Sequence, residues 1–157
     1  MSSAWVNSKT VFQKTVEINA PISQVWELLT KPELMKKWMM PDIELHIVTD
    51  WKVGNPILIN GNMNGKDFQN KGIVLEFEPE KTLQYSHLSS ISRLPEHPDS
   101  YALFQFQLFP TERGTQLGFT LNNFPTESIY KHLVFYWNVT LEVLKRTAEE
   151  QGYANWV

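Results

Sequence analysis

Cysteine is absent from the 157-residue sequence, which excludes disulfide bonds and thiolate metal sites. Positive charge is also scarce, because 14 Lys and Arg stand against 17 Asp and Glu and the formal net charge is −3. A protein that binds nucleic acid through its phosphates needs a surplus of basic side chains to displace counterions. We therefore expect no nucleic-acid partner.

Long apolar runs are missing as well. No segment approaches the ~20 apolar residues of a membrane-spanning helix, so we expect no membrane insertion. Residues 1–9 lack the basic start and apolar run of a signal peptide. These observations predict a cytoplasmic protein.

Aromatic residues, in contrast, are abundant, with six Trp, five Tyr and nine Phe. Each of these side chains buries a large area but packs in few geometries. Their number therefore predicts either a bulky core or a cavity with rigid walls. The length suits one domain, and we expect a single domain over residues 1–157.

The first part of the chain predicts one strand and two short helices. Residues 10–19 alternate between polar and apolar positions, which is typical of a strand. Pro21 suits the start of a helix, and Pro32 ends the helical spacing that follows. A second short helix, with Trp38 on its apolar side, is expected to close at Pro41.

Two Asn-Gly steps, Asn60-Gly61 and Asn64-Gly65, favour hairpin turns because both residue types tolerate positive φ. A phosphate-binding loop is the alternative for this glycine-containing segment. Its spacing is one residue short of the Walker pattern, and Asp67 replaces the hydroxyl residue that would hold magnesium. We therefore predict a hairpin.

Further strands are expected after this hairpin. Alternation predicts one strand up to Pro79, and a next strand in which Tyr85 and His87 share a face. The strand that ends before Pro79 is expected to carry three apolar side chains on one face: Ile73, Leu75 and Phe77. Residues 89–99 are polar, contain two prolines and form the longest expected loop.

The last third of the chain predicts a two-stranded hairpin and a long helix. Residues 102–108 and 117–121 alternate strictly, which indicates two half-buried strands. Thr126 suits the N-cap of a helix whose apolar stripe continues to Ala148, and Gly152 is expected to end it.

The grouping of strands with helices outside the group predicts an α+β fold with an antiparallel sheet of about six to seven strands. Because the long C-terminal helix is amphipathic, it must bury its stripe against that sheet.

Several stretches stand in a familiar order along nearly the whole chain. Residues 19–30 read NAPISQVWELLT, residues 72–79 read GIVLEFEP, and the last helix carries Trp137 on its stripe. Together they resemble the START-like (SRPBCC) superfamily, in the branch similar to the C-terminal domain of the heat-shock protein 90 ATPase activator. The resemblance implies the helix-grip fold, in which a long helix and a concave sheet enclose a cavity that often holds apolar ligands.

The sequence departs from this family's pattern at several positions, some of which bear on the cavity. Tyr136 stands where a glycine usually precedes the helix tryptophan, and Asn55 replaces the second glycine of a common pair. His87 stands where a large aromatic is common, and Asn122 where a histidine is common. Relatives are therefore a poor guide to the inside of this cavity.

No catalytic or metal-binding constellation is found in the sequence. The four histidines are scattered without metal-ligand spacing, so we expect no metal and no cofactor. His87 is interpreted either as a hydrogen-bonded core histidine or as a cavity group that orients a ligand or acts as a general base. Glu76 and Glu78 share a strand face and are expected on the solvated outer side rather than as an acid and base pair.

The segment Trp38-Met39-Met40 also has two interpretations. Trp38 continues the apolar side of its helix, which favours core packing. The two methionines could instead form a pliable cavity mouth, because thioethers adapt to irregular shapes. The resemblance places this segment at the cavity rim.

Three functions are compatible with these observations. The leading hypothesis is non-catalytic binding of a small apolar or aromatic molecule between the sheet and the C-terminal helix. The candidate wall residues are Trp38, Met40, Leu75, Phe77, Tyr85, His87, Phe104, Phe106, Leu133 and Trp137.

The other two hypotheses come from the resemblance. One is a protein-interaction module that modulates a chaperone, which we favour less because the full-length activators carry an additional N-terminal domain. The other is an enzyme similar to the cyclases and aromatases of the wider superfamily, for which Glu76, Tyr85 and His87 are the residues to test.

Overall fold

The structure is a computed structural model that describes residues 10–156, with side chains as far as residue 150. The strands are β1 (Val11–Ile18), β2 (Leu45–Thr49), β3 (Pro56–Met63), β4 (Lys66–Glu78), β5 (Thr82–Ser89), β6 (Ala102–Thr111) and β7 (Gly114–Asn122). The helices are α1 (Ile22–Thr30), α2 (Pro32–Met35) and α3 (Glu127–Trp156), and the short 3₁₀ helices η2 (Ser90–Ser92) and η3 (Pro98–Ser100) lie between β5 and β6.

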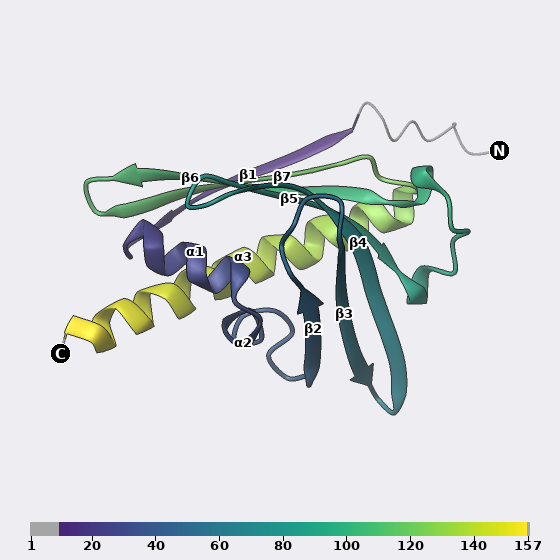
Figure 1. The fold of residues 1–157 in the computed structure, drawn as a ribbon, viewed down its shortest axis with the longest axis horizontal. Helices are drawn as coiled ribbons and strands as arrows, with labels where there is room; N and C mark the ends of the chain where they lie inside the picture. The colour runs from purple at the N-terminus through teal and green to yellow at the C-terminus, as the bar shows by residue number, and fades with distance from the viewer. Residues whose placement is uncertain (1–9, 157) are drawn as a thin grey trace.

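Over the described residues, the seven strands form one antiparallel sheet in the order β1-β7-β6-β5-β4-β3-β2. The part of the sheet that contains β2, β3 and β4 bends away from the part that contains β1, β7 and β6, so the sheet is curved (Figure 1). α3 crosses the inner side of this curve, with α1 and α2 beside it. The expected α+β helix-grip arrangement is therefore confirmed.

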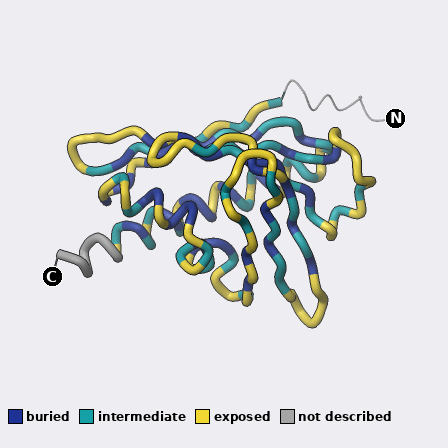
Figure 2. Tube along the Cα trace, in the orientation of Figure 1, coloured by how far each residue is buried: buried dark blue, intermediate teal, exposed yellow. Residues whose placement is uncertain are grey.

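The core lies between the inner face of the sheet and the apolar stripe of α3. Buried segments face each other there, while the hairpin tips are exposed (Figure 2). The stripe residues Leu133, Trp137, Leu141, Leu144 and Ala148 are all buried, as their helical spacing predicted.

The start of α3 was predicted correctly and its end was not. The backbone N–H of Ile129 donates to Thr126 Oγ1 at 3.1 Å, which is the expected N-cap hydrogen bond. The helix continues past Gly152 to Trp156. A glycine inside a helix costs only about 1 kcal/mol relative to alanine, so it is a weak stop signal.

β4 does not present the face that its apolar pattern suggested. Ile73 and Leu75 are exposed, whereas Val74 is buried. A register shift between Val74 and Glu76 then returns Phe77 to the inner side, where its ring lies 5.3 Å from that of Trp26. Such a bulge changes which face a side chain occupies, and alternation alone does not reveal it.

The hairpin between β3 and β4 is confirmed, but only one of its two Asn-Gly steps forms the turn. Asn64 and Gly65 both have positive φ, of 54° and 82°. Gly61 instead lies within β3, opposite Phe68. A Cβ at this glycine would stand 2.6 Å from the Phe68 ring, so close packing explains it better than turn geometry.

The second short helix is shorter than predicted. α2 ends at Met35, and the chain turns before Trp38. The Trp38 Nε1 donates to the Leu28 carbonyl at 2.7 Å, so this tryptophan is held by α1 in the buried core. A tertiary hydrogen bond therefore decides the path of this segment.

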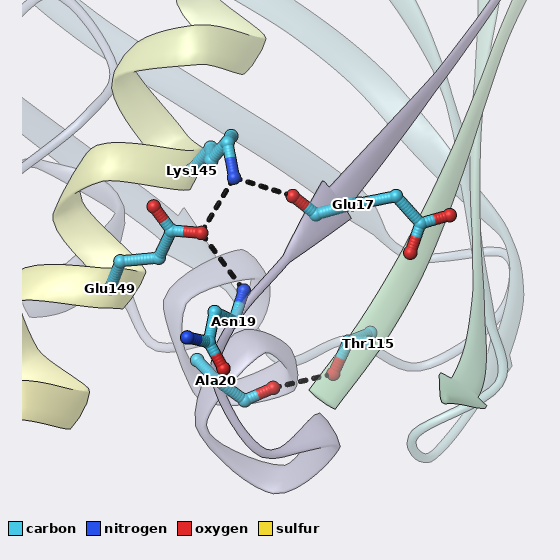
Figure 3. Close-up of polar contacts among 6 residues, drawn as sticks. All are labelled: Glu17, Asn19, Ala20, Thr115, Lys145 and Glu149. Atoms are coloured by element: carbon cyan, nitrogen blue, oxygen red, sulfur yellow. Dashed lines mark hydrogen bonds and ion pairs between the residues drawn. The ribbon is translucent and has the colours of Figure 1, made fainter. Parts of the chain in front are cut away.

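Polar contacts attach α3 to the end of β1 (Figure 3). Lys145 Nζ donates to the Glu17 carbonyl at 2.7 Å and pairs with Glu149 at 2.6 Å. Glu149 Oε2 also accepts from the backbone N–H of Asn19 at 2.9 Å. These contacts hold the C-terminal half of α3 against the sheet, while its N-terminal half lies over the cavity described below.

A buried hydrogen bond attaches the segment that follows β1 to β7. Thr115 Oγ1 donates to the Ala20 carbonyl at 2.8 Å (Figure 3), and Thr115 is fully buried. We expect Thr115→Val to lower the free energy of unfolding by about 1–2 kcal/mol, because the carbonyl loses its buried donor. Urea denaturation would measure this loss. Thr120→Val, on the same strand but only partly buried, is the control, and equal losses in the two variants would contradict the assignment.

Candidate functional site

A cavity of about 530 Å³ lies between the inner face of the sheet and the first half of α3. This size is within the range of small-molecule sites, roughly 300–1,000 Å³. Its apolar and aromatic lining is Met39, Met40, Leu45, Ile59, Met63, Phe68, Tyr85, Leu88, Ile91, Ala102, Phe104, Pro125, Ile129, Leu133, Tyr136 and Trp137. Its polar lining is Asn70, His87, Ser89, Ser92, Ser100, Ser128 and His132.

Six of the ten candidate wall residues line this cavity. They are Met40, Tyr85, His87, Phe104, Leu133 and Trp137. Phe104 is central to this wall, because its ring lies 4.7 Å from that of His87, 5.5 Å from that of Tyr85 and 5.3 Å from that of Trp137. Rings held against one another in this way form a rigid surface for a flat ligand.

The other four candidates lie elsewhere. Trp38 and Phe106 are buried in the core, where both contact the Trp137 ring from positions outside the cavity lining. Phe77 packs against Trp26 and Trp51. Leu75 is 41% exposed on the outer side of β4, because it alternates with the buried Val74, and the bulge brings only the following Phe77 back to the inner side.

The Trp38-Met39-Met40 segment divides between its two interpretations. Trp38 belongs to the core, whereas Met39 and Met40 line the cavity. Burial raises the pKa of the Tyr136 hydroxyl, which interacts with Thr140 and with the backbone of Met40, so this tyrosine connects the segment to α3. Tyr136, one of the departures from the family pattern, is therefore part of the cavity wall.

Several lining residues were not predicted from the sequence, among them Asn70 and His132. Phe68, Asn70 and Gly72 are buried alternate residues at the start of β4. Only Phe68 of the three is apolar, so the sequence shows no alternation that would reveal this buried face. His132 was missed as a lining residue because its helix position is exposed and lies beside the apolar stripe.

The cavity opens between the first turns of α3 and the loops at the ends of β3 and β5. The exposed lining residues mark this mouth: Met63 at the end of β3, Ile91 in η2, and Ser128 and His132 on α3. Met63 and Ile91 are exposed apolar side chains, so the mouth is apolar on the side of the sheet.

The two buried titratable groups on β5, Tyr85 and His87, are neutral at pH 7. Burial, and then the neighbouring His132, lower the pKa of His87 to about 4. Burial also raises the pKa of the Tyr85 hydroxyl, with Tyr136 contributing. None of the described lining residues is Asp, Glu, Lys or Arg.

The residues proposed for catalysis do not converge in the cavity. Tyr85 and His87 line it, but Glu76 is exposed on the outer face of β4 and is not among the lining residues. A general base is most effective when its pKa lies near the working pH, and burial moves that of His87 well below it. Among the described residues, no group of three or more His, Asp or Glu side chains could hold a metal ion.

Comparison with known proteins gives the family. Residues 19–149 match the family described as Activator of Hsp90 ATPase homolog 1-like protein. The chain belongs to this family. No curated protein matches the sequence. Within residues 10–156, no helix of this family member is long and apolar enough to cross a membrane.

Solved structures support the same assignment. ChR145 from Cytophaga hutchinsonii is 36% identical, with a TM-score of 0.78 over 93% of this chain and 98% of that chain. The Aha1 dimer from Colwellia psychrerythraea is 24% identical, with a TM-score of 0.69 over 89% and 96%. CV1439 from Chromobacterium violaceum is 17% identical, with a TM-score of 0.74 over 88% and 97%. At these lower identities, the last two show the shared fold alone.

Proposed function

We propose that this family member binds a small, largely apolar or aromatic molecule in the cavity beneath α3, without transforming it. The observation that carries this proposal is a cavity of about 530 Å³ walled by packed aromatic rings and aliphatic side chains. Burial of an apolar ligand there contributes roughly 25 cal/mol per Å² of apolar surface removed from water.

The fluorescent probe N-phenyl-1-naphthylamine, titrated into the protein, tests this proposal. Leu133→Trp should weaken probe binding by about tenfold or more, because the larger ring fills the cavity and displaces aromatic contacts worth roughly 1.4 kcal/mol in total. Phe135→Trp is the matched control, since Phe135 lies on the same helix and is 72% exposed. Equal affinity in both variants, or no binding by the wild type, would contradict the proposal.

Native mass spectrometry of protein purified from its own cells identifies the natural ligand class. A reproducible extra mass that is released by denaturation supports the proposal. Once refolded without this molecule, the protein should bind the fluorescent probe.

Family membership favours one other candidate, the modulation of a chaperone. The test is the ATPase rate of the cognate heat-shock protein 90 with and without the purified protein. Acceleration would support this candidate, and an unchanged rate at saturating protein would count against it.

A further inference from the structure

One polar side chain inside the proposed ligand site has no hydrogen-bond partner among the described residues. His87 lies inside the protein on β5, and it keeps accessible surface because it lines the cavity. The unpaired side-chain atoms that no probe can reach are Asn70 Oδ1 and Asn122 Oδ1, and the two ring nitrogens of His87 are not among them. These nitrogens therefore face the cavity, where a ligand can reach them.

The neighbours of His87 leave the edge of its ring open. One face of the imidazole stacks on Phe104, with the ring centroids 4.7 Å apart and the planes at 22°. Ala102, directly opposite His87 on β6, has a small side chain and also lines the cavity. Because the nitrogens lie in the edge of an imidazole ring, the stacking leaves them available for hydrogen bonds.

The imidazole of His87 offers one donor and one acceptor. Burial, and then the neighbouring His132, lower its pKa, so the ring is neutral at pH 7. The described lining contains no Asp or Glu that would hold a second proton on it. A neutral imidazole carries an N–H group on one nitrogen and a lone pair on the other. A hydroxyl group both donates and accepts, so it can pair with either nitrogen.

The second histidine of the cavity has a different position. His132 is exposed at the mouth, so water can satisfy its nitrogens and a hydrogen bond to a ligand gains little there. His87 instead stands against the aromatic wall, where Phe104 also contacts the ring of Trp137 at 5.3 Å. An aromatic ligand that packs on this wall brings its substituents next to His87.

Building on the proposed function, we infer that the ligand is a mainly apolar or aromatic molecule with a hydroxyl group that hydrogen-bonds to the imidazole of His87. The rings of Phe104 and Trp137 hold the apolar body. His87 fixes the orientation of the ligand and favours a hydroxyl over a methyl group of the same size.

Two probes of nearly the same shape test this inference at pH 7. They are 2-naphthol and 2-methylnaphthalene, which differ only by a hydroxyl in place of a methyl group. We expect the ratio of their affinities, naphthol over methylnaphthalene, to be about tenfold higher for the wild type than for His87→Phe. Comparing ratios cancels the difference in hydrophobicity between the probes, and phenylalanine keeps a ring against Phe104.

The matched control is His46→Phe. His46 is exposed on β2 and lies outside the described cavity lining, so this variant should keep the wild-type ratio. A second measurement reports on the ring itself. In protein labelled with ¹⁵N-histidine, the nitrogen signals that are lost in His87→Phe should shift with 2-naphthol and much less with 2-methylnaphthalene. A purely structural role for His87 would not produce this difference.

The outcomes separate this inference from the function on which it rests. If the wild type and His87→Phe give the same ratio, the inference is wrong and the binding function stands. The inference is also wrong if the ratio falls in Tyr85→Phe or His132→Gln but not in His87→Phe, because another group then anchors the hydroxyl. If neither probe binds, and N-phenyl-1-naphthylamine does not bind either, both are wrong.

Discussion

Replacing Gly72 with alanine should lower the free energy of unfolding by about 3 kcal/mol, the upper end of the usual cost of overpacking. A Cβ at Gly72 would lie 1.7 Å from the carbonyl oxygen of Ser86. That oxygen belongs to the backbone of the neighbouring strand β5, so it cannot move away as a flexible side chain would. The clash must separate β4 from β5 where the sheet curves.

Gly118→Ala is the matched control for this prediction. Gly118 also lies within a strand, β7, but a Cβ there would meet only the Gln107 carbonyl oxygen at 3.9 Å. We expect this variant to be neutral or more stable by up to about 1 kcal/mol, since alanine restricts the unfolded chain. Urea denaturation of both variants measures the difference. Similar stabilities would show that β4 and β5 do not approach as described.

The second large effect concerns the pH dependence of stability. His87 has a pKa of about 4 in the folded protein, against an ordinary value of 6.5. Between these values the unfolded chain binds a proton that the folded protein does not, so stability falls as the pH falls from 6.5 to 4. The full loss attributable to His87 is at most about 3 kcal/mol. Above pH 6.5 this contribution is fully present.

His87→Phe should remove the part of the fall in unfolding free energy between pH 6.5 and 4 that His87 causes. Phenylalanine does not titrate and keeps a ring against Phe104, which His87 contacts at 4.7 Å. The titratable groups facing His87 are Tyr85 on its own strand and His132 and Tyr136 on α3. The tyrosines do not ionise in acid, and the double variant with His132→Gln separates the contribution of that histidine.

The measurement is the free energy of unfolding in urea at intervals from pH 7 to pH 4. Carboxylates that titrate in this range contribute equally to both proteins. Glu149 is one of them: partial burial raises its pKa, but its hydrogen bonds to Lys145 and Asn19 outweigh burial, so the pKa is lowered. The difference between wild type and variant therefore reports on His87. Parallel curves would mean that His87 is protonated in the folded protein as easily as in the unfolded chain.

Much of the candidate site could be predicted from periodicity. Phe104 on β6 and Leu133 and Trp137 on α3 follow from strict alternation and helical spacing, and all three line the cavity. Tyr85 and His87 follow from the alternation of β5. Their roles in ligand binding stay predictions, because a residue that lines the cavity does not necessarily contribute to binding affinity.

The errors concentrate where the backbone is irregular or where a tertiary contact overrides local preference. Leu75 was placed on one face with Phe77 because the bulge after Val74, which puts these two side chains on opposite faces, is invisible in an apolar pattern. Trp38 was a candidate wall residue, but its hydrogen bond to Leu28 holds it in the core, as its place on the apolar side of its helix favoured. Asn70 was overlooked because a polar side chain adds nothing to an apolar pattern, although it occupies a buried position of a strand.

The sequence by itself determined the α+β class, the order of the elements, the capped start of α3 and its buried stripe. These features depend on side-chain periodicity and on local hydrogen bonding, both of which are encoded within a few residues. Only the tertiary structure decided where β4 bends and which residues enclose the cavity. Those features depend on contacts between distant segments, such as Gly72 against Ser86, whose geometry no local pattern contains.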